Sequence, residues 1–485
     1  MSALLPAVRG RSWPIAVALT LLLGACADDG GDGSEPASSA PHATAPEDAE
    51  AEGGATIDDR GAQDLGNSRL YPDETSVTAE TAADLTEAWT LSDVVGVTGT
   101  PTIVDDVAYF GDWAGSVRAV DPGTGDEVWT TELAGAVIGT TPVEGDAVFA
   151  SAGTTLYRLD RETGEVQWEA STHDHPFAMI SASPVVAGGV VLQGVASGEL
   201  TVAQPDYGFL GAIGAYDVET GEEVWRFVTT PGDDTSGAGV GIWSTPAVDL
   251  DRGVLYFGTG NTYEEPSSPR ADAIVALDLQ TGEEVWTTQF TRTDVFSAGN
   301  PFGSDADVGT APNLWTADGR DLVGAADKAG TYHALDRETG EVVWETELSS
   351  GSYLGGAIGS AAFVDGRLIV TSNVGNPENN SPGTTVGIFA LDPVTGEALW
   401  DIEIEDTIYA PVSAVPGVAF VGTLSGAMLA LDTATGEELW RAEAPNSVGA
   451  GPAVHDGTVL WGYGFSLFEG PGDGGVLAFT LSDAG

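Results

Sequence analysis

Apolar and polar residues alternate in short stretches along this chain, and one such stretch recurs. Its clearest copy is ALDRETGEVVW, residues 334–344, in which small and apolar residues lead to an Asp, a Thr-Gly pair and a Trp. Alternating side chains such as Val342 and Trp344 are typical of a half-buried strand, and glycine allows the positive φ of a tight turn. Each copy therefore predicts a strand, a turn and a second strand.

Two partial copies lie at the two ends of the repeated region. LTEAW, which ends at Trp89, has the second strand without the first, and VLAFT, residues 476–480, has the first strand without the second. If these two strands pair, they form an eighth hairpin beside the seven full copies. Repeats of this length with a Gly and a Trp in each unit then predict an all-β, eight-bladed β-propeller, its ring closed by pairing of the N- and C-terminal strands. The full copies end at Trp129, Trp168, Trp225, Trp286, Trp344, Trp400 and Trp440.

The repeat occupies nearly all of the chain after residue 66, so the 485 residues contain one large domain rather than several. We assign this domain to residues 63–485. Residues 27–62 consist of Asp, Glu, Gly, Ser, Pro and Ala with almost no large apolar residue. That composition predicts a flexible, acidic linker.

The first 26 residues have the layout of a secretory signal. Two arginines precede an apolar run from Trp13 to Leu23, which is too short to span a membrane. The run ends in Leu-Gly-Ala-Cys, which resembles a bacterial lipobox, so we predict a lipoprotein signal peptide in which Cys26 carries the lipid. The mature protein would then be extracytoplasmic and anchored to the cell membrane. The alternative is an uncleaved signal in which Cys26 has no such role.

The charge of the chain restricts its partners. Lys+Arg number 16 and Asp+Glu 74, which gives a formal net charge of -58. Nucleic acid is excluded as a partner, because contacts with phosphate need basic residues. We interpret the acidic surface as a solubility device. Since Cys26 is the only cysteine, the domain contains no disulfide and no C-x-x-C-H motif for a covalent haem.

Four consecutive repeats are longer than the others. Successive tryptophans are 39 or 40 residues apart near both ends of the repeated region and 56 to 61 residues apart in the middle. Insertions in a repeat array tend to lie on one face, often the binding face. One of them contains Lys328, the only lysine of the chain. A lysine can titrate or donate as a compact ammonium, which a guanidinium does not do; the alternative is an ordinary turn residue.

The inserted segments resemble a known family. The segment of residues 64–89 is similar to the N-terminal segment that leads into the propeller of the pyrroloquinoline quinone (PQQ)-dependent dehydrogenases, the eight-bladed quinoprotein alcohol dehydrogenase family. Its sequence is DLGNSRLYPDETSVTAETAADLTEAW, and the similarity extends to the C-terminus. The Asp-x-x-Thr-Gly-x-x-x-Trp repeat is shared with propellers that only bind, so it indicates architecture and not activity. By resemblance, VASGEL and YFGTGN give Glu199 and Asn261 as calcium ligands, and GIWSTP gives Trp243 as the indole on which the quinone stacks.

Further positions follow from the same resemblance. In GSDADVGTAP, Asp305 stands seven residues before Pro312, the spacing of the family's catalytic Asp, which also binds the metal. Lys328 matches the basic residue beside the quinone oxygens. Ser181 in ISASP and Asn373 in VTSN resemble positions that hydrogen-bond the cofactor.

The resemblance implies oxidation of an alcohol or polyol, with the electrons passed to an external acceptor. Calcium is a hard cation that takes oxygen ligands and would act as a Lewis acid on the quinone. Asp305 would accept the hydroxyl proton while hydride leaves for the quinone, and Lys328 would stabilise the charge that develops there.

Asp307 leaves the identity of the metal open. The lanthanide-using branch of the family has an extra Asp two residues after the catalytic one, and Asp305-Ala306-Asp307 has that spacing. The alternative is an acidic loop in a chain that is acidic everywhere.

Two departures from the family pattern affect the site. The adjacent-cysteine disulfide that covers the quinone in many members is missing here. The usual Trp-Asp around the catalytic Asp is also missing, and TDVFSAGNPFGSDADVG leaves Asp294 as a competing candidate for the base. This longer, Asp-rich form resembles relatives similar to polyvinyl alcohol dehydrogenases, without a haem domain.

His173-Asp174-His175 is either a pair of metal ligands or a polar turn, and we favour the turn. The tryptophan that ends each repeat is expected to dock neighbouring blades. The rival is a non-enzymatic propeller lipoprotein that binds proteins, resembling the outer-membrane assembly scaffold, which has shorter and more even repeats.

Overall fold

The computed structural model describes residues 64–481 apart from 231–235, 302, 377–380 and 467–469. The predicted signal peptide, Cys26 and the acidic linker lie outside the described residues. Within the part of the chain that is described, no helix has the length and apolar character of a membrane span.

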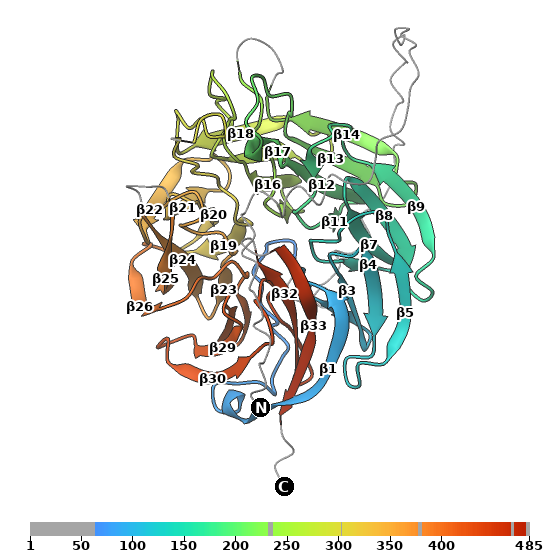
Figure 1. The fold of residues 1–485 in the computed structure, drawn as a ribbon. Helices are drawn as coiled ribbons and strands as arrows, with labels where there is room; N and C mark the ends of the chain where they lie inside the picture. Colours follow the sequence, from blue (N-terminus) through green and yellow to red (C-terminus); the bar gives the residue numbers. More distant parts are fainter. Residues whose placement is uncertain (1–63, 231–235, 302, 377–380, 467–469, 482–485) are drawn as a thin grey trace, which may run out of the picture.

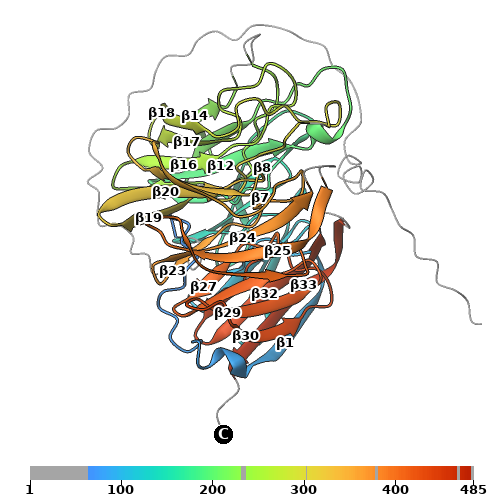
Figure 2. The ribbon, with the colours of Figure 1, turned by 90° about the vertical axis from the view of Figure 1, so that its left-hand side faces the viewer.

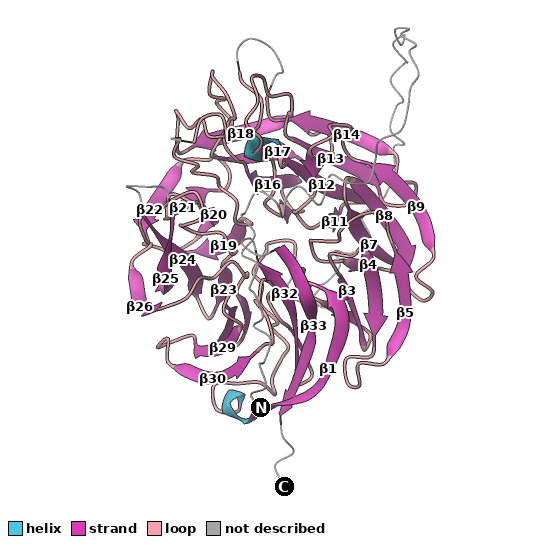
Figure 3. Cartoon of the chain, viewed as in Figure 1, coloured by secondary structure: helices cyan, strands magenta, loops and turns pink. Residues whose placement is uncertain are grey.

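Across the described residues, the strands form eight antiparallel sheets arranged around a ring, with short helical turns at only two positions (Figures 1 and 3). Seen from the side, the sheets stack next to one another around the disc (Figure 2). The predicted eight-bladed propeller is confirmed. The first strands of several neighbouring sheets contact one another, so they line the centre.

Each sheet contains four main strands in the order of the chain, except at the closing position. Blades 1 to 4 comprise β2 Thr102–Val104, β3 Val107–Gly111, β4 Ser116–Val120 and β5 Glu127–Glu132; β6 Val143–Glu144, β7 Ala147–Ala152, β8 Thr155–Asp160 and β9 Val166–Ser171; β11 Val185–Ala187, β12 Val190–Ser197, β13 Ala212–Asp217 and β14 Glu223–Val228, with β10 Ala178–Met179 added on β12; and β15 Ala247–Asp249, β16 Val254–Gly258, β17 Ala273–Asp278 and β18 Glu284–Gln289.

The remaining sheets complete the ring and carry the two longest hairpins, β24–β25 and β32–β33. Blades 5 to 8 comprise β19 Asn313–Ala317, β20 Arg320–Ala326, β21 Thr331–Asp336 and β22 Val342–Glu347; β23 Ala362–Val364, β24 Arg367–Asn376, β25 Ser381–Leu391 and β26 Ala398–Ile404; β27 Ser413–Val415, β28 Val418–Gly422, β29 Ala427–Asp432 and β30 Glu438–Glu443; and β31 Ala453–His455, β32 Thr458–Ser466, β33 Gly470–Leu481 and β1 Leu85–Val95. The 3-10 turns are η4 Ala82–Asp84 and η5 Glu199–Thr201.

The last blade joins the two ends of the domain. Its sheet order is β1-β33-β32-β31, and β1 pairs antiparallel with β33 from Leu85 opposite Leu481 to Val95 opposite Asp473. Figure 1 shows the blue β1 beside the red β33 at this position. The predicted closure between the N- and C-terminal strands is confirmed, and it leaves neither strand as an open edge.

The repeated Asp and Thr-Gly build the turn between the third and fourth strands. In blade 5 the Asp336 carboxylate accepts hydrogen bonds from the backbone N–H of Glu338 and Thr339 at 3.1 and 3.0 Å. Gly340 has φ +72°, a conformation that a residue with a Cβ rarely adopts. The motif therefore encodes the local turn.

The same motif also locks neighbouring blades together. Trp225 of blade 3 donates from Nε1 to the Leu279 carbonyl of blade 4 at 2.9 Å, and a Cβ on Gly282 of blade 4 would lie 2.5 Å from the Trp225 ring. At the closing position Trp440 donates to the Leu85 carbonyl at 2.9 Å. The expectation that these tryptophans dock neighbouring blades is confirmed. Trp344 differs, since its buried Nε1 has no hydrogen-bond partner among the described residues.

Replacing Gly282 by alanine is expected to destabilise the propeller more than the matched change Gly253→Ala. Gly253 has φ +64°, close to the +69° of Gly282, but a Cβ there meets nothing within 4 Å. Both variants should lose about 1–2 kcal/mol through the positive φ, and Gly282→Ala about 1–3 kcal/mol more through the clash with Trp225. Thermal or urea unfolding measures the difference, and equal losses would show that the Trp–Gly contact contributes nothing.

The N-terminal segment of the domain lies across the first strands of four successive blades. Its backbone carbonyls at Leu65, Gly66, Ser68 and Arg69 accept hydrogen bonds from β15, β19, β23 and β27 at 2.6 to 2.9 Å. This segment therefore ties together the blades that carry most of the insertions.

Candidate active site

Three of the predicted site residues lie on long connections of blades 3 to 5. The fourth, Lys328, lies in a four-residue turn as short as those of the short blades, so the expectation that an insertion contains it is wrong. Trp243 is in the connection between β14 and β15, Asn261 follows β16, Asp305 is in the connection from β18 to β19, and Lys328 is in the turn between β20 and β21. Neighbouring blades bring these connections together, although the residues are up to 85 positions apart in the sequence.

An ion-pair cluster forms the centre of the site. Lys328 Nζ lies 3.2 and 3.1 Å from the two carboxylate oxygens of Asp305 and 3.0 Å from Asp307 Oδ2. The three side chains are largely buried, with exposed fractions of 12% for Lys328, 1% for Asp305 and 8% for Asp307. The structure thus brings together the only lysine and the two aspartates of GSDADVG.

Asp307 connects this cluster to the next two connections. Its Oδ2 also accepts a hydrogen bond from Trp243 Nε1 at 3.1 Å, and its Oδ1 accepts one from the backbone N–H of Asn261 at 2.6 Å. Asp307 therefore fixes Trp243 and Asn261 relative to Lys328.

Aromatic rings surround the ammonium. Lys328 Nζ lies 5.4 Å from the centroid of the Trp243 ring and 5.8 Å from that of Tyr353, distances at which a cation is attracted to the ring face. A Cβ on Gly309 would lie 1.7 Å from the Trp243 ring, so only glycine fits against this indole. Tyr353 was not predicted, and no sequence signal distinguishes it from other connection residues.

Burial and charge set the protonation of the pair. Burial raises the pKa of Asp305, and the attraction of Lys328 offsets only part of that rise. Burial alone would lower the pKa of Lys328, but the carboxylates of Asp305 and Asp307 reverse this and raise it. Lys328 therefore remains an ammonium, and Asp305 is a stronger base than an exposed carboxylate, which suits a proton acceptor near neutral pH.

Two family models match parts of this chain. The family described as "Glucose/ethanol/alcohol dehydrogenase, beta-propeller domain" matches residues 147–350, and "Outer membrane protein assembly factor BamB" matches residues 73–211 and 382–484. A polyvinylalcohol dehydrogenase from Pseudomonas sp is 27% identical over 408 residues, covering 74% of this chain and 63% of its own length. A polyvinylalcohol dehydrogenase from Sphingopyxis sp. (strain 113P3) is 29% identical over 383 residues, covering 68% of this chain and 58% of its own length.

The solved structure of quinohemoprotein alcohol dehydrogenase from Comamonas testosteroni superposes with a TM-score of 0.73 at 23% identity, covering 86% of this chain and 79% of that chain. These similarities support the predicted family, the PQQ-dependent dehydrogenase propellers. The predicted family is confirmed. The chain spans less than two thirds of the length of the polyvinylalcohol dehydrogenases that it matches.

The predicted metal ligands of this chain differ in their surroundings. Asn261 donates from Nδ2 to the carbonyls of Thr262 and Phe296 at 2.7 and 2.8 Å, and among the described residues its Oδ1 accepts no hydrogen bond. That amide oxygen and the carboxylates of Asp305 and Asp307 are hard oxygen donors of the kind that calcium or a lanthanide ion takes. These residues fit a hard cation.

Glu199 is held by its own insertion. It lies in η5, and its carboxylate accepts backbone N–H bonds from Gly208 and Phe209 at 2.8 to 3.2 Å, with His175 Nε2 at 3.5 Å. Glu199 and Asp307 both lie near Tyr263, because burial and then the charges of Asp307 and Glu199 raise the pKa of that tyrosine. Among the described residues, Glu199, Asp305 and Asp307 do not form a group whose oxygens all lie within 4.8 Å of one another.

Two weaker candidates lie away from the ion pair. Asn373 on β24 donates from Nδ2 to the Ile408 carbonyl at 2.8 Å, and its Oδ1 accepts from the Ile408 N–H at 2.9 Å. It therefore joins β24 to the connection between β26 and β27. Ser181 is half-buried between β10 and β11. Within the described part of the chain, neither side chain hydrogen-bonds Lys328 or Asp305.

Asp294, the competing candidate for the base, has a different position. Its Oδ2 accepts a hydrogen bond from the backbone N–H of Ala306 at 2.6 Å. It therefore supports the loop that carries Asp305 and Asp307 and does not contact Lys328 Nζ directly. The Asp-rich stretch was the sequence signal for it.

The two histidines of the third blade are half-buried rather than fully exposed. His173 Nδ1 accepts the backbone N–H of His175 at 3.0 Å, and both rings pack against Phe209 at 5.0 and 5.8 Å. The packing supports a structural turn beside Glu199.

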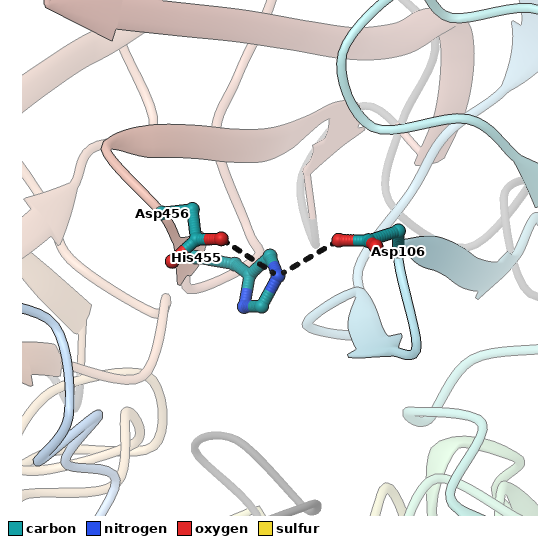
Figure 4. Close-up of side chains that lie close together, drawn as sticks. All are labelled: Asp106, His455 and Asp456. Carbon is teal, nitrogen blue, oxygen red and sulfur yellow. Dashed lines mark hydrogen bonds and ion pairs between the residues drawn. The ribbon is translucent and has the colours of Figure 1, made fainter.

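One group of histidine and acidic ligand atoms within 4.8 Å of one another occurs among the described residues, on other turns of the ring. His455 Nε2 lies 3.4 Å from Asp106 and 3.8 Å from Asp456, between the β2–β3 and β31–β32 turns (Figure 4). Both carboxylates are exposed, 86% and 88%, so water stabilises them and no ion is needed. The group bridges the first and last blades.

Proposed function

We propose that this chain is a PQQ-dependent dehydrogenase that oxidises an alcohol or polyol and passes the electrons to an external acceptor. The observation that carries the proposal is the placement of the only lysine between two buried aspartates and against Trp243. A propeller that only binds proteins has no need for buried, charged side chains at this position.

The surroundings of Trp243 support binding of a flat cofactor. The indole lies against Gly309, where no side chain fits, and its N–H is fixed by Asp307. A rigid, orientated indole offers the apolar face on which an aromatic ring system stacks. When bound, PQQ would supply the two-electron oxidation, and calcium or a lanthanide ion would polarise it.

The protein itself would manage the proton and the charge. Asp305 would accept the proton of the substrate hydroxyl, because burial makes it a stronger base. Lys328 would keep a positive charge beside the reacting atoms and stabilise negative charge that develops there. Asn261, Asp305 and Asp307 would hold the cation, with Glu199 as a further candidate.

Reconstitution tests the proposal. The purified propeller is mixed with PQQ and either Ca²⁺ or La³⁺, and quinone binding and dye-linked oxidation of primary alcohols, secondary alcohols and polyvinyl alcohol are measured. We expect quinone binding and oxidation of at least one of these alcohols. Absence of quinone binding with both metals, and of oxidation with every alcohol, would refute it.

A pair of glycine variants shows whether the quinone binds at Trp243. In Gly309→Ala the added methyl group would clash with the Trp243 indole and displace it, so quinone binding should weaken at least tenfold. Gly449→Ala is the control, since its Cβ would meet only ordinary contacts at 3.4 Å. Equal binding by both variants would exclude Trp243 as the stacking surface.

The scaffold function is the second candidate. The BamB family matches residues 73–211 and 382–484, whereas the dehydrogenase family matches residues 147–350, which contain three of the four long repeat intervals. The site residues Trp243, Asn261, Asp305 and Lys328 all lie in the dehydrogenase match. This division favours the enzyme.

We also propose that the protein is extracytoplasmic and anchored through a lipid on Cys26, as the lipobox-like LGAC suggests. Labelling of cells with radioactive palmitate should mark the wild-type protein and not Cys26→Ser. Equal labelling of both would contradict the anchor.

A further inference from the structure

Two buried carboxylates beside the candidate site have oxygens without partners. Asp272 is fully buried, and neither of its carboxylate oxygens has a hydrogen-bond partner among the described residues. Asp294 is 1% exposed, and its Oδ1 also has none. A buried carboxylate without a partner is strongly unfavourable, so each of these three oxygens requires an explanation.

The backbone holds both aspartates at the same part of the fold. Asp272 directly precedes β17 with φ +50°; its N–H donates to the Gly260 carbonyl at 3.2 Å, and its own carbonyl accepts from Phe290 N–H at 2.9 Å. Asp294 is fixed through Oδ2 by Ala306 N–H at 2.6 Å. The connections 259–272 and 290–312 therefore meet around these side chains.

The two carboxylates lie within electrostatic reach of each other. Burial raises the pKa of Asp272 well above its ordinary value, and the largest of the neighbouring charges that add to this rise is that of Asp294, followed by those of Asp307 and Asp305. Burial also raises the pKa of Asp294. Without a cation, the raised pKa therefore favours the neutral, protonated form of Asp272.

Among the described residues, no protein cation forms an ion pair with these two carboxylates when they ionise. Lys328 is the only lysine, and its ammonium contacts Asp305 and Asp307. Within the described residues no arginine or histidine forms an ion pair with Asp272 or Asp294. A hard cation that takes oxygen ligands would satisfy the unpartnered oxygens and neutralise both carboxylates together.

We propose that Asp272 and Asp294 bind a second cation, a calcium ion, in addition to the cation proposed at Asn261, Asp305 and Asp307. Such an ion would tie the connection 259–272, which carries Asn261, to the connection 290–312, which carries Asp305 and Asp307. It would hold the two sets of cofactor-site residues in place without touching the substrate.

Calcium binding to the purified propeller without quinone tests the proposal. Bound calcium is measured by equilibrium dialysis and atomic emission, at high NaCl and with excess Mg²⁺, because salt screens the acidic surface. Asp272→Asn should bind one calcium ion per chain fewer than the wild type. Asp305→Asn should keep that ion, and Asp456→Asn, in the exposed group, is the control for surface binding.

Thermal unfolding adds a readout that does not depend on counting ions. Without calcium, Asp272→Asn should melt at the same temperature as the wild type or higher, because it removes a buried unpaired carboxylate. With calcium, the wild type should gain several degrees, and the variant should gain less than half of that increase.

Two results would overturn the second site. One is calcium binding by Asp272→Asn equal to that of the wild type. The other is a single ion that is lost in both Asp272→Asn and Asp305→Asn, which would make Asp272 part of one shared site. Neither result depends on alcohol oxidation, so the test separates failure of this inference from failure of the proposed enzyme.

Discussion

Replacing Asp305 by asparagine is expected to lower kcat/KM for alcohol oxidation about 10³-fold in the protein reconstituted with PQQ and calcium. The amide keeps the shape of the carboxylate but cannot accept the hydroxyl proton. Asp305 is 1% exposed and lies 3.1 Å from Lys328 Nζ, and burial raises its pKa. The measurement is dye-linked oxidation at saturating quinone, with quinone affinity determined separately.

Asp294→Asn is the matched comparison, because the sequence left Asp294 as a competing base. Its Oδ2 accepts the N–H of Ala306, so the variant should disturb the loop and cost activity about tenfold or less. A loss after Asp294→Asn that exceeds the loss after Asp305→Asn would assign the proton transfer to Asp294 and contradict the geometry.

The fold was predictable because one motif encodes two levels of structure. Asp336 and Gly340 form the local turn, and the glycine and tryptophan of the same motif also form the contact between blades. The position of Trp89 and the strand at residues 476–480 then gave the closure. The short first strands, such as β15, gave no signal, because three buried residues have no periodicity that distinguishes strand from loop.

The candidate site was only partly predictable. Lys328 stood out as the only lysine, and the motifs around Asp305 and Asn261 stood out by resemblance, so the sequence could nominate them. The positions of Glu199 and Asn373 could not be predicted from motif spacing. The backbone groups that hydrogen-bond them, and the Gln204 side chain that donates to Glu199 at 2.7 Å, are placed by the paths of long connections. Asp272 was missed, since an aspartate before an apolar strand resembles any turn residue of an acidic chain.

Replacing Lys328 by arginine is expected to lower kcat/KM about 10²-fold and to change stability little. The ammonium lies between two carboxylates at 3.0 to 3.2 Å, and a Cβ on Gly356 would come within 2.7 Å of the Lys328 Cα, so the surroundings are closely packed. The planar guanidinium keeps the charge but cannot place it on one compact atom at the same point. Steady-state kinetics and the melting temperature of the reconstituted protein measure both effects.

Lys328→Met separates charge from geometry. It leaves Asp305 and Asp307 buried without their counter-charge, and removing one partner of such a cluster costs about 3–5 kcal/mol. Lys328→Met should therefore lose both stability and activity, whereas Lys328→Arg should lose activity alone. Full activity of Lys328→Arg would mean that any cation suffices at this position, and the retention of a single lysine in this chain would then have no catalytic reason.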